Sequence, residues 1–213
     1  MQTVNIILVL VVLTNLKLLG SSRLGSMIRV VAVQGFVLGL LPILGHPGEP
    51  TFRFGLLASG TLALKGVVFP WLLFRALREA EVAREVQPYV GYVSSLGIGV
   101  VLLSVAFWMC GRLPVPEGIA PAWLAPVALF SIFCGLFLIV GRKRAVTQVL
   151  GFLVLENGVY TFGIGVAPAT SLLVEAGVLL DVFVAVFVMG ITIFHINREF
   201  DHIETDRLSS LKD

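Results

Sequence analysis

Residues 152–187 read FLVLENGVYTFGIGVAPATSLLVEAGVLLDVFVAVF, and this stretch decides the fold. It is apolar and long enough to cross a lipid bilayer twice as helices of about 20 residues each. It nevertheless carries three carboxylates, Glu156, Glu175 and Asp181. A charge at the centre of a bilayer costs at least about 2.5–3.5 kcal/mol, so acids in such a stretch need a specific reason to be there.

The composition of the whole chain is that of a membrane protein with several spans. Of its 213 residues, 57% are hydrophobic and only 13% are charged, and the net charge of +2 gives no basic surface of the kind that binds nucleic acid. Backbone groups must be satisfied inside lipid, which favours helices. We therefore predict an all-α integral membrane protein with about seven transmembrane helices, over residues 2–20, 27–45, 54–76, 90–110, 122–141, 145–166 and 170–196.

The distribution of cations predicts the direction of these helices. Twelve cations fall on one set of alternate loops and ends, and only Arg53 and Arg112 fall on the other. Because cytoplasmic loops carry an excess of Lys and Arg, the N-terminus is expected outside and the C-terminus in the cytoplasm. The twelve are Lys17, Arg23, Arg29, Arg75, Arg78, Arg84, Arg142, Lys143, Arg144, Arg198, Arg207 and Lys212.

Three ionisable residues are predicted at one depth. Lys65, Glu156 and Asp181 each lie eleven residues into their spans, which at 1.5 Å per residue is roughly 17 Å deep, close to the midplane. Such residues face the protein interior, pair with one another or bind water. Closely spaced carboxylates and burial both favour the protonated form of an acid, so Glu156 and Asp181 are suited to taking up and releasing protons.

Further polar residues accompany these three. One helical face carries Asp181, the apolar Val188, and the polar Thr192 and His195. This face leads to the cytoplasmic rim, where a histidine can exchange protons with water. Tyr160 follows Glu156 at i+4, and Thr61 lies one turn from Lys65. Pro70 removes the usual hydrogen-bond donor for the carbonyl of Gly66, beside the lysine.

Simpler interpretations stay open for the same residues. Lys65 can be a structural ion-pair partner that fixes helix packing, and Glu156 with Asp181 can be structural as well. Glu175 lies only five residues into the last span, and two interpretations fit it equally well: a rim residue that reaches water, or a residue of the proton relay. Tyr160 and Thr192 are also ordinary packing residues, and His195 fits an interfacial position.

No cofactor or metal site is expected in this chain. His195, Glu199 and His202 share one face of the polar C-terminal segment, but a third well-placed ligand is missing, and a solvated tail that docks on a cytoplasmic partner fits better. Cys110 and Cys134 lie in different apolar runs and are expected as buried apolar side chains. The sequence also contains no nucleotide-binding loop or nucleophile motif.

Two segments carry a family resemblance: GRKRAVTQVLGFLVLENGVYTFG, and LLVEAGVLLDVFVAVFVMGITIFHINREF after it. Together they resemble the K-type membrane subunit of respiratory complex I, with RKR at 142–144 as its basic turn, Glu156 as its first acid and Asp181 as its second. The whole length, including LKGVVFPWLL, is more closely similar to the hydrogenase-4 component E family. The second acid is Asp rather than Glu here, so Glu175 competes with Asp181 for that position.

The resemblance implies a membrane-arm subunit of a complex I-related [NiFe] hydrogenase in the cytoplasmic (inner) membrane. Its partners would be antiporter-like and hydrogenase-anchoring membrane subunits and a cytoplasmic hydrogenase arm, which would hold the NiFe centre and the iron–sulfur clusters. The implied organisation is a four-helix region over residues 1–121, a K-like three-helix region over 122–197 and a polar tail over 198–213. The carboxylates would belong to a relay for H⁺ or Na⁺, with Lys65 tuning them and His195 at the cytoplasmic end.

Three rival functions follow from the same residues. A subunit of a multi-subunit cation/proton antiporter would use these acids without a redox partner. A structural scaffold of the membrane arm would use them only to pair with lysine. A stand-alone solute transporter would need a substrate pocket, which the sequence does not show.

Overall fold

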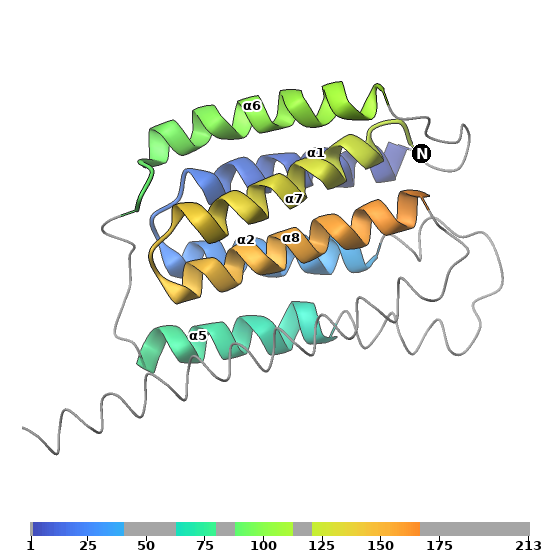
Figure 1. Cartoon of the computed structure of the whole chain (residues 1–213). Helices are drawn as coiled ribbons and strands as arrows, with labels where there is room; N and C mark the ends of the chain where they lie inside the picture. The colour runs from blue at the N-terminus through green and yellow to red at the C-terminus, as the bar shows by residue number, and fades with distance from the viewer. Residues whose placement is uncertain (1, 41–62, 80–87, 113–120, 167–213) are drawn as a thin grey trace, which may run out of the picture.

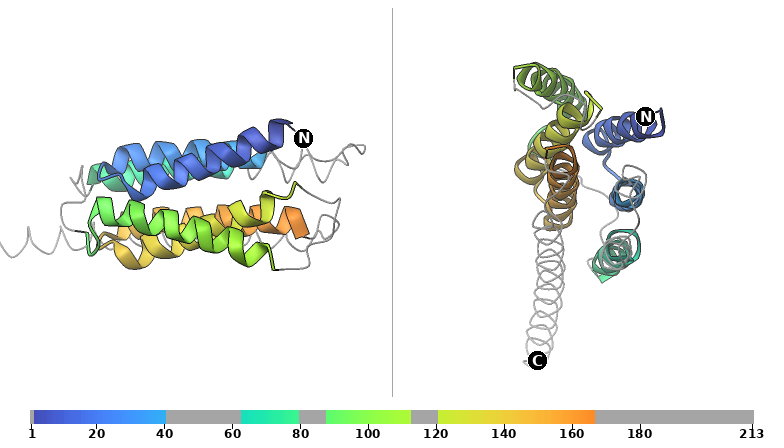
Figure 2. Two further views of the ribbon diagram at one scale, coloured as in Figure 1. Left: turned by 90° about the horizontal axis from the view of Figure 1, so that it is seen from above. Right: turned by 90° about the vertical axis from the view of Figure 1, so that its right-hand side faces the viewer.

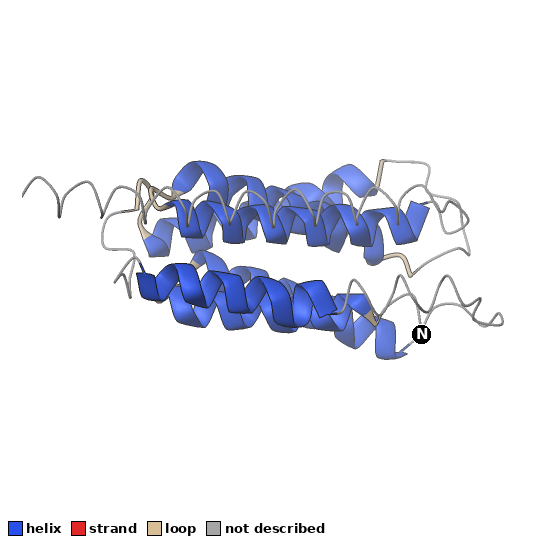
Figure 3. Cartoon of the chain, turned by 90° about the horizontal axis from the view of Figure 1, so that it is seen from below, coloured by secondary structure: helices blue, strands red, loops and turns tan. Residues whose placement is uncertain are grey.

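A computed structural model describes residues 2–40, 63–79, 88–112 and 121–166 of the chain, and in these ranges every regular element is a helix (Figure 3). The elements are α1 (Gln2–Leu19), α2 (Leu24–Gly39), η1 (Leu64–Val68), α5 (Phe69–Glu79), α6 (Tyr92–Cys110), α7 (Leu124–Gly141) and α8 (Ala145–Val166). Within the described part of the chain, α1, α6, α7 and α8 are each long and apolar enough to cross a membrane, and α2 is a shorter apolar helix. The prediction of an all-helical membrane protein is therefore confirmed at this level.

The predicted spans agree with the helices except at some ends. The expected boundaries of 90–110, 122–141 and 145–166 fall within two residues of α6, α7 and α8. The second span is predicted to start at residue 27, but α2 begins at Leu24. The reason is that the chain turns back at once after Gly20, whose N–H still donates to the carbonyl of Leu16 at 3.1 Å. The expected last span, residues 170–196, lies outside the described residues. The count of seven spans and their direction stay predictions.

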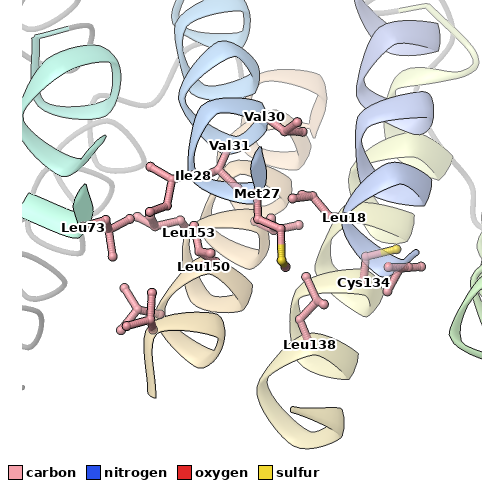
Figure 4. Close-up of a cluster of buried hydrophobic side chains, with 14 of the residues drawn as sticks. Leu18, Met27, Ile28, Val30, Val31, Leu73, Cys134, Leu138, Leu150 and Leu153 are labelled. Atoms are coloured by element: carbon pink, nitrogen blue, oxygen red, sulfur yellow. The ribbon is translucent and has the colours of Figure 1, made fainter. Parts of the chain in front are cut away.

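The helices form two layers. Seen end on, α6, α7 and α8 make one layer, and α1, α2 and α5 make the other (Figure 2). Across the layers α1 packs on α7 and α2 packs on α8 (Figure 1). The seam between the layers is filled by apolar side chains from both sides, among them Leu18, Met27, Leu138 and Leu150 (Figure 4).

The helices α7 and α8 form a tight antiparallel hairpin because glycines let their backbones meet. A Cβ added at Gly135 would lie 2.5 Å from the backbone nitrogen of Leu155, and one added at Gly158 would lie 2.7 Å from that of Ile132. No side chain fits at such distances, so small residues are required here, as is common where membrane helices approach closely. This contact fixes the height of α8, and with it the height of Glu156.

The outer faces of the helices carry large apolar side chains. On α6, Val93, Val101 and Trp108 are all exposed, and on α1, Ile6 and Leu13 are exposed. An apolar surface of this kind is stable in contact with lipid or with another apolar protein surface. Cys110 and Cys134 are both buried, as expected of apolar side chains.

Candidate functional site

The lysine of the site lies on a widened turn. Lys65 belongs to the π-helical segment η1, which runs directly into α5 at Phe69. Pro70 follows one residue later and has no N–H, so the carbonyl of Gly66 has no i+4 donor and an ordinary α-helix is disfavoured at this point. Single π-helical turns inside helices occur often at functional sites. The local irregularity anticipated from Pro70 is thus present, as a π turn.

Lys65 forms a buried ion pair with Glu156. Its Nζ lies 2.5 Å from Oε1 of Glu156, and the two side chains are only 7% and 1% exposed. Glu156 lies eleven residues into the 22-residue helix α8, so the pair sits near the middle of that helix. Two residues 91 positions apart in the sequence, expected at one depth, are therefore in direct contact inside the protein.

Neighbouring side chains complete the environment of the ammonium group. Nζ of Lys65 also donates to Oδ1 of Asn157 at 3.3 Å and lies 5.2 Å from the centre of the Tyr160 ring. The hydroxyl of Thr161 donates to the backbone carbonyl of Asn157 at 2.7 Å. On the opposite side Gly35 of α2 makes room for the lysine stem, since a Cβ there would lie 3.1 Å from Cβ of Lys65.

The carboxylate of Glu156 is less well satisfied than its partner. Beyond the Lys65 ammonium it has no hydrogen-bond donor among the described residues, and Oε2 is a buried acceptor without a partner there. Tyr160, four residues after Glu156, does not hydrogen-bond the carboxylate; its ring lies beside the Lys65 ammonium instead. A buried acceptor without a donor is uncommon, and such groups often mark a functional site or bound water.

This geometry permits a specific proton transfer. If a proton moves from Nζ of Lys65 to Oε1 of Glu156, an N–H bond is broken, an O–H bond is formed and both groups become neutral. Because the net charge of the pair is unchanged, the transfer creates no isolated charge at low dielectric, where an uncompensated charge is expensive. The pair can thus exist as two ions or as two neutral groups.

A second buried polar cluster was not anticipated from the sequence. Asn15 of α1 donates to Oγ of Ser131 at 2.8 Å and accepts from Nε2 of Gln34 at 2.9 Å. All three side chains are at most 1% exposed. Neutral amides in otherwise apolar helices were a usable signal, but their pattern alone does not say that three helices bring them together.

Arg142 is a second buried cation, and it was treated in the sequence only as a loop charge. Its side chain is fully buried between α7 and α8. Its NH2 group donates to the carbonyl of Leu19 at 2.7 Å, its NH1 group donates to the carbonyl of Val90 at 3.3 Å, and the guanidinium lies 4.6 Å from the ring centre of Tyr92. It therefore ties the end of α1 and the start of α6 to the α7–α8 turn.

The remaining predicted site residues cannot be placed. Of the predicted set, the structure brings together Lys65, Glu156 and Tyr160. Thr61, Glu175, Asp181, Thr192 and His195, and with them Glu199 and His202 of the metal test, lie outside the described residues, so their roles stay predictions. Among the described ranges, no group of three His, Cys, Asp or Glu residues is arranged to hold a metal.

The fold and the site together define an all-helical membrane protein with a lysine–glutamate pair in its interior. Over 203 residues the chain is 32% identical to "Uncharacterized protein Rv0085" of Mycobacterium tuberculosis, a match that covers 95% of this chain and 92% of that protein. The chain belongs to the family of this mycobacterial protein.

A second likeness covers part of the chain. Over 113 residues it is 31% identical to "Hydrogenase-4 component E" of Escherichia coli K12, with 53% of this chain and 51% of that protein covered. The protein of the same name from Shigella flexneri matches to the same extent. The chain thus matches about half the length of these hydrogenase-4 components. No protein-family model and no solved structure matches it.

Proposed function

We propose that this chain is a membrane-arm subunit of an energy-converting [NiFe] hydrogenase of the hydrogenase-4 type, and that Lys65 and Glu156 form one station of a proton relay in it. The observation that carries the proposal is the buried ion pair, with Nζ and Oε1 2.5 Å apart between η1 and α8. The partial likeness to hydrogenase-4 component E supports the type of complex.

The reason for a relay, as opposed to a structural role, is the character of the two groups. Both can change protonation state, and a proton passing between them leaves the pair neutral overall. Oε2 of Glu156 remains as an acceptor for a proton that arrives from elsewhere. Ionisable groups within the membrane are expensive, and proton pathways are among the functions that retain them.

The proposal includes the finer architecture implied by the sequence. The chain would have seven spans, with the N-terminus outside and the C-terminus in the cytoplasm, and residues 122–197 would correspond to a K-type subunit of complex I. Asp181 would be the second relay acid, with Glu175 as its competitor, and His195 would take up protons at the cytoplasmic end. Tyr160, Thr61 and Thr192 would be supporting polar groups.

The complex would supply what this chain does not. It would lie in the inner membrane and contain antiporter-like and hydrogenase-anchoring membrane subunits, together with a cytoplasmic hydrogenase arm. The NiFe centre and the iron–sulfur clusters would be in those partner subunits, so this chain would take part in ion translocation and not in electron transfer.

The decisive experiment replaces Glu156 by Gln in the intact complex. Gln keeps the size of the side chain and an acceptor for Lys65, but its amide does not take up a proton near neutral pH. With assembly verified by co-purification, we expect proton translocation in membrane vesicles to fall to background. Thr161→Val is the matched control, because it removes only a hydrogen bond within α8 and is expected to leave translocation unchanged. Full translocation by an assembled Glu156→Gln complex would support the scaffold function instead.

Lys65→Arg provides a second test of the same station. Arginine keeps the positive charge and the ion pair, but it is not deprotonated in proteins. A relay that passes a proton through the lysine therefore stops, whereas a scaffold that needs only the ion pair continues. Co-purification with a nickel–iron subunit separates the hydrogenase from the antiporter alternative, because the antiporter has no redox partner.

A further inference from the structure

The cluster of Asn15, Gln34 and Ser131 forms a hydrogen-bond chain with a defined direction. The hydroxyl of Ser131 donates its single proton to the carbonyl of Val127 at 3.0 Å, so it must accept from the amide of Asn15. The oxygen of Asn15 then faces Nε2 of Gln34. This order fixes both amide orientations, because reversing either one would set two donors or two acceptors against each other.

The chain ends at an acceptor that lacks a donor. Oε1 of Gln34 is buried and has no hydrogen-bond partner among the described residues, and the side chain is 0% exposed. Oε2 of Glu156 is likewise buried without a hydrogen-bond partner among the described residues, on a side chain that is 1% exposed. A buried polar group without a partner costs about 1–3 kcal/mol, so each of these oxygens requires a donor.

The two acceptors belong to helices that pack against each other, because α2 lies against α8. On α2, Gln34 is followed by Gly35, which lies against the stem of Lys65, and Lys65 binds Glu156. On the other side Gln34 binds Asn15, which binds Ser131.

The hairpin of α7 and α8 connects the residues next to Ser131 and Asn157. Ile132, which follows Ser131, lies against Gly158, and Gly158 follows Asn157, the second partner of Lys65. These contacts and neighbouring positions therefore link α1, α2, η1, α8 and α7, and both unsatisfied oxygens belong to residues of this linked set.

We propose that Gln34 and Glu156 bind a buried water molecule that donates one hydrogen to Oε1 of Gln34 and the other to Oε2 of Glu156. A water molecule has the two donors that two acceptors require, and buried waters usually make two to four hydrogen bonds to polar groups of this kind. The site joins the neutral cluster on α1, α2 and α7 to the ion pair on η1 and α8.

The site gives Glu156 a water partner within the proton relay, and only this functional consequence rests on the proposed function. A water between Glu156 and Gln34 places an exchangeable proton beside the carboxylate on the side away from Lys65. The hydrogen bond from Nε2 of Gln34 to Asn15 fixes the orientation of the Gln34 amide that holds this water. The water site itself is a statement about hydration of the folded chain and needs no partner subunit.

The test is solid-state NMR of the full chain in hydrated lipid bilayers, with nitrogen-15 in the Asn and Gln side chains. Polarisation transferred from water is expected to reach the side-chain amide of Gln34. The signal of this amide is assigned as the one that is missing in the Gln34→Leu variant. In the double variant Lys65→Met/Glu156→Leu the water loses a partner while no buried charge is left alone. The transfer to Gln34 is then expected to disappear, whereas in Thr161→Val it persists.

The outcomes are separable from those of the proposed function. A Gln34 amide that receives no polarisation from water in the folded wild-type chain overturns the water site, whatever Glu156→Gln does to translocation. Transfer that persists in the double variant also overturns it, because the water would then be independent of Glu156. A hydrated Gln34 together with full translocation by Glu156→Gln leaves the water site standing and removes the relay.

Discussion

Among the described residues Lys65 and Arg142 are both buried cations, and their surroundings differ. Lys65 meets a carboxylate, an amide oxygen and the face of an aromatic ring. Arg142 meets the backbone carbonyls of Leu19 and Val90 and the ring of Tyr92. The contacts of Lys65 thus include an acid, and the hydrogen bonds of Arg142 to Leu19 and Val90 go to neutral acceptors.

The difference lies in whether the partner of the cation can itself carry a proton. Arginine is always charged, and the backbone carbonyls of Leu19 and Val90 cannot take a proton, so these contacts have a single protonation state. Lysine and glutamate can both change state, and lysine does so readily when buried. Burial of a charged side chain in a membrane helix is thus insufficient to identify a proton site; the chemistry of its partner decides.

The largest expected effect comes from removing one half of the ion pair. Glu156→Leu leaves the Lys65 ammonium buried without its carboxylate, and breaking a buried pair in this way costs about 3–5 kcal/mol. In Lys65→Met/Glu156→Leu both charges are gone, and replacement of a buried pair by apolar residues is often neutral. Unfolding of the purified chain in mixed detergent micelles should therefore show the single variant far less stable than the double variant. Equal losses in both variants would mean that the pair is not coupled in the folded chain.

Arg142→Met is expected to have the next largest effect. It removes charged hydrogen bonds to two carbonyls at the ends of helices, each worth about 1.5–3 kcal/mol, and the expected loss is about 3 kcal/mol in unfolding free energy. Lys143→Met is the matched control, since Lys143 is exposed and contacts the ring of Tyr89 at 4.9 Å, so it should cost less than about 1 kcal/mol. Similar losses for the neighbouring cations would show that Arg142 acts only as a loop charge.

Much of the fold and part of the site follow from the sequence. The apolar runs predict α1, α6, α7 and α8 closely, because the thickness of the hydrocarbon layer fixes the length of a spanning helix. Counting residues from the ends of the runs also predicts that Lys65 and Glu156 share a depth, and the structure places them in contact. Depth is a one-dimensional quantity, which a linear sequence records well.

The features that the sequence does not reveal depend on how the helices turn toward one another. The rule that places cations in cytoplasmic loops treats Arg142 and Lys143 alike. Which of the two points inward depends on where the carbonyls of α1 and the segment before α6 lie. In the same way, Asn15 and Gln34 are unremarkable neutral residues until α7 brings Ser131 beside them. Such contacts join residues as far as 123 positions apart, and no local pattern records them.

Gly35→Ala tests the smallest effect, which concerns how tightly the lysine stem is held. A Cβ at residue 35 would lie 3.1 Å from Cβ of Lys65, so the stem must move by a few tenths of an ångström. At Gly97 on α6 an added Cβ meets nothing within 4 Å, and Gly97→Ala should stabilise that helix by about 0.5–1 kcal/mol.

Since both sites are helical, the two substitutions share that gain in helix propensity. In Gly35→Ala we expect the displacement of Lys65 to cancel it, which leaves Gly35→Ala about 1 kcal/mol less stable than Gly97→Ala in detergent unfolding. Arg142 is not involved in either substitution, so the difference reports on the packing of the Lys65 stem. Equal stabilisation by both would show that the lysine stem relaxes freely, and the contrast between a held lysine and a clamped arginine would then rest on their partners and not on their packing.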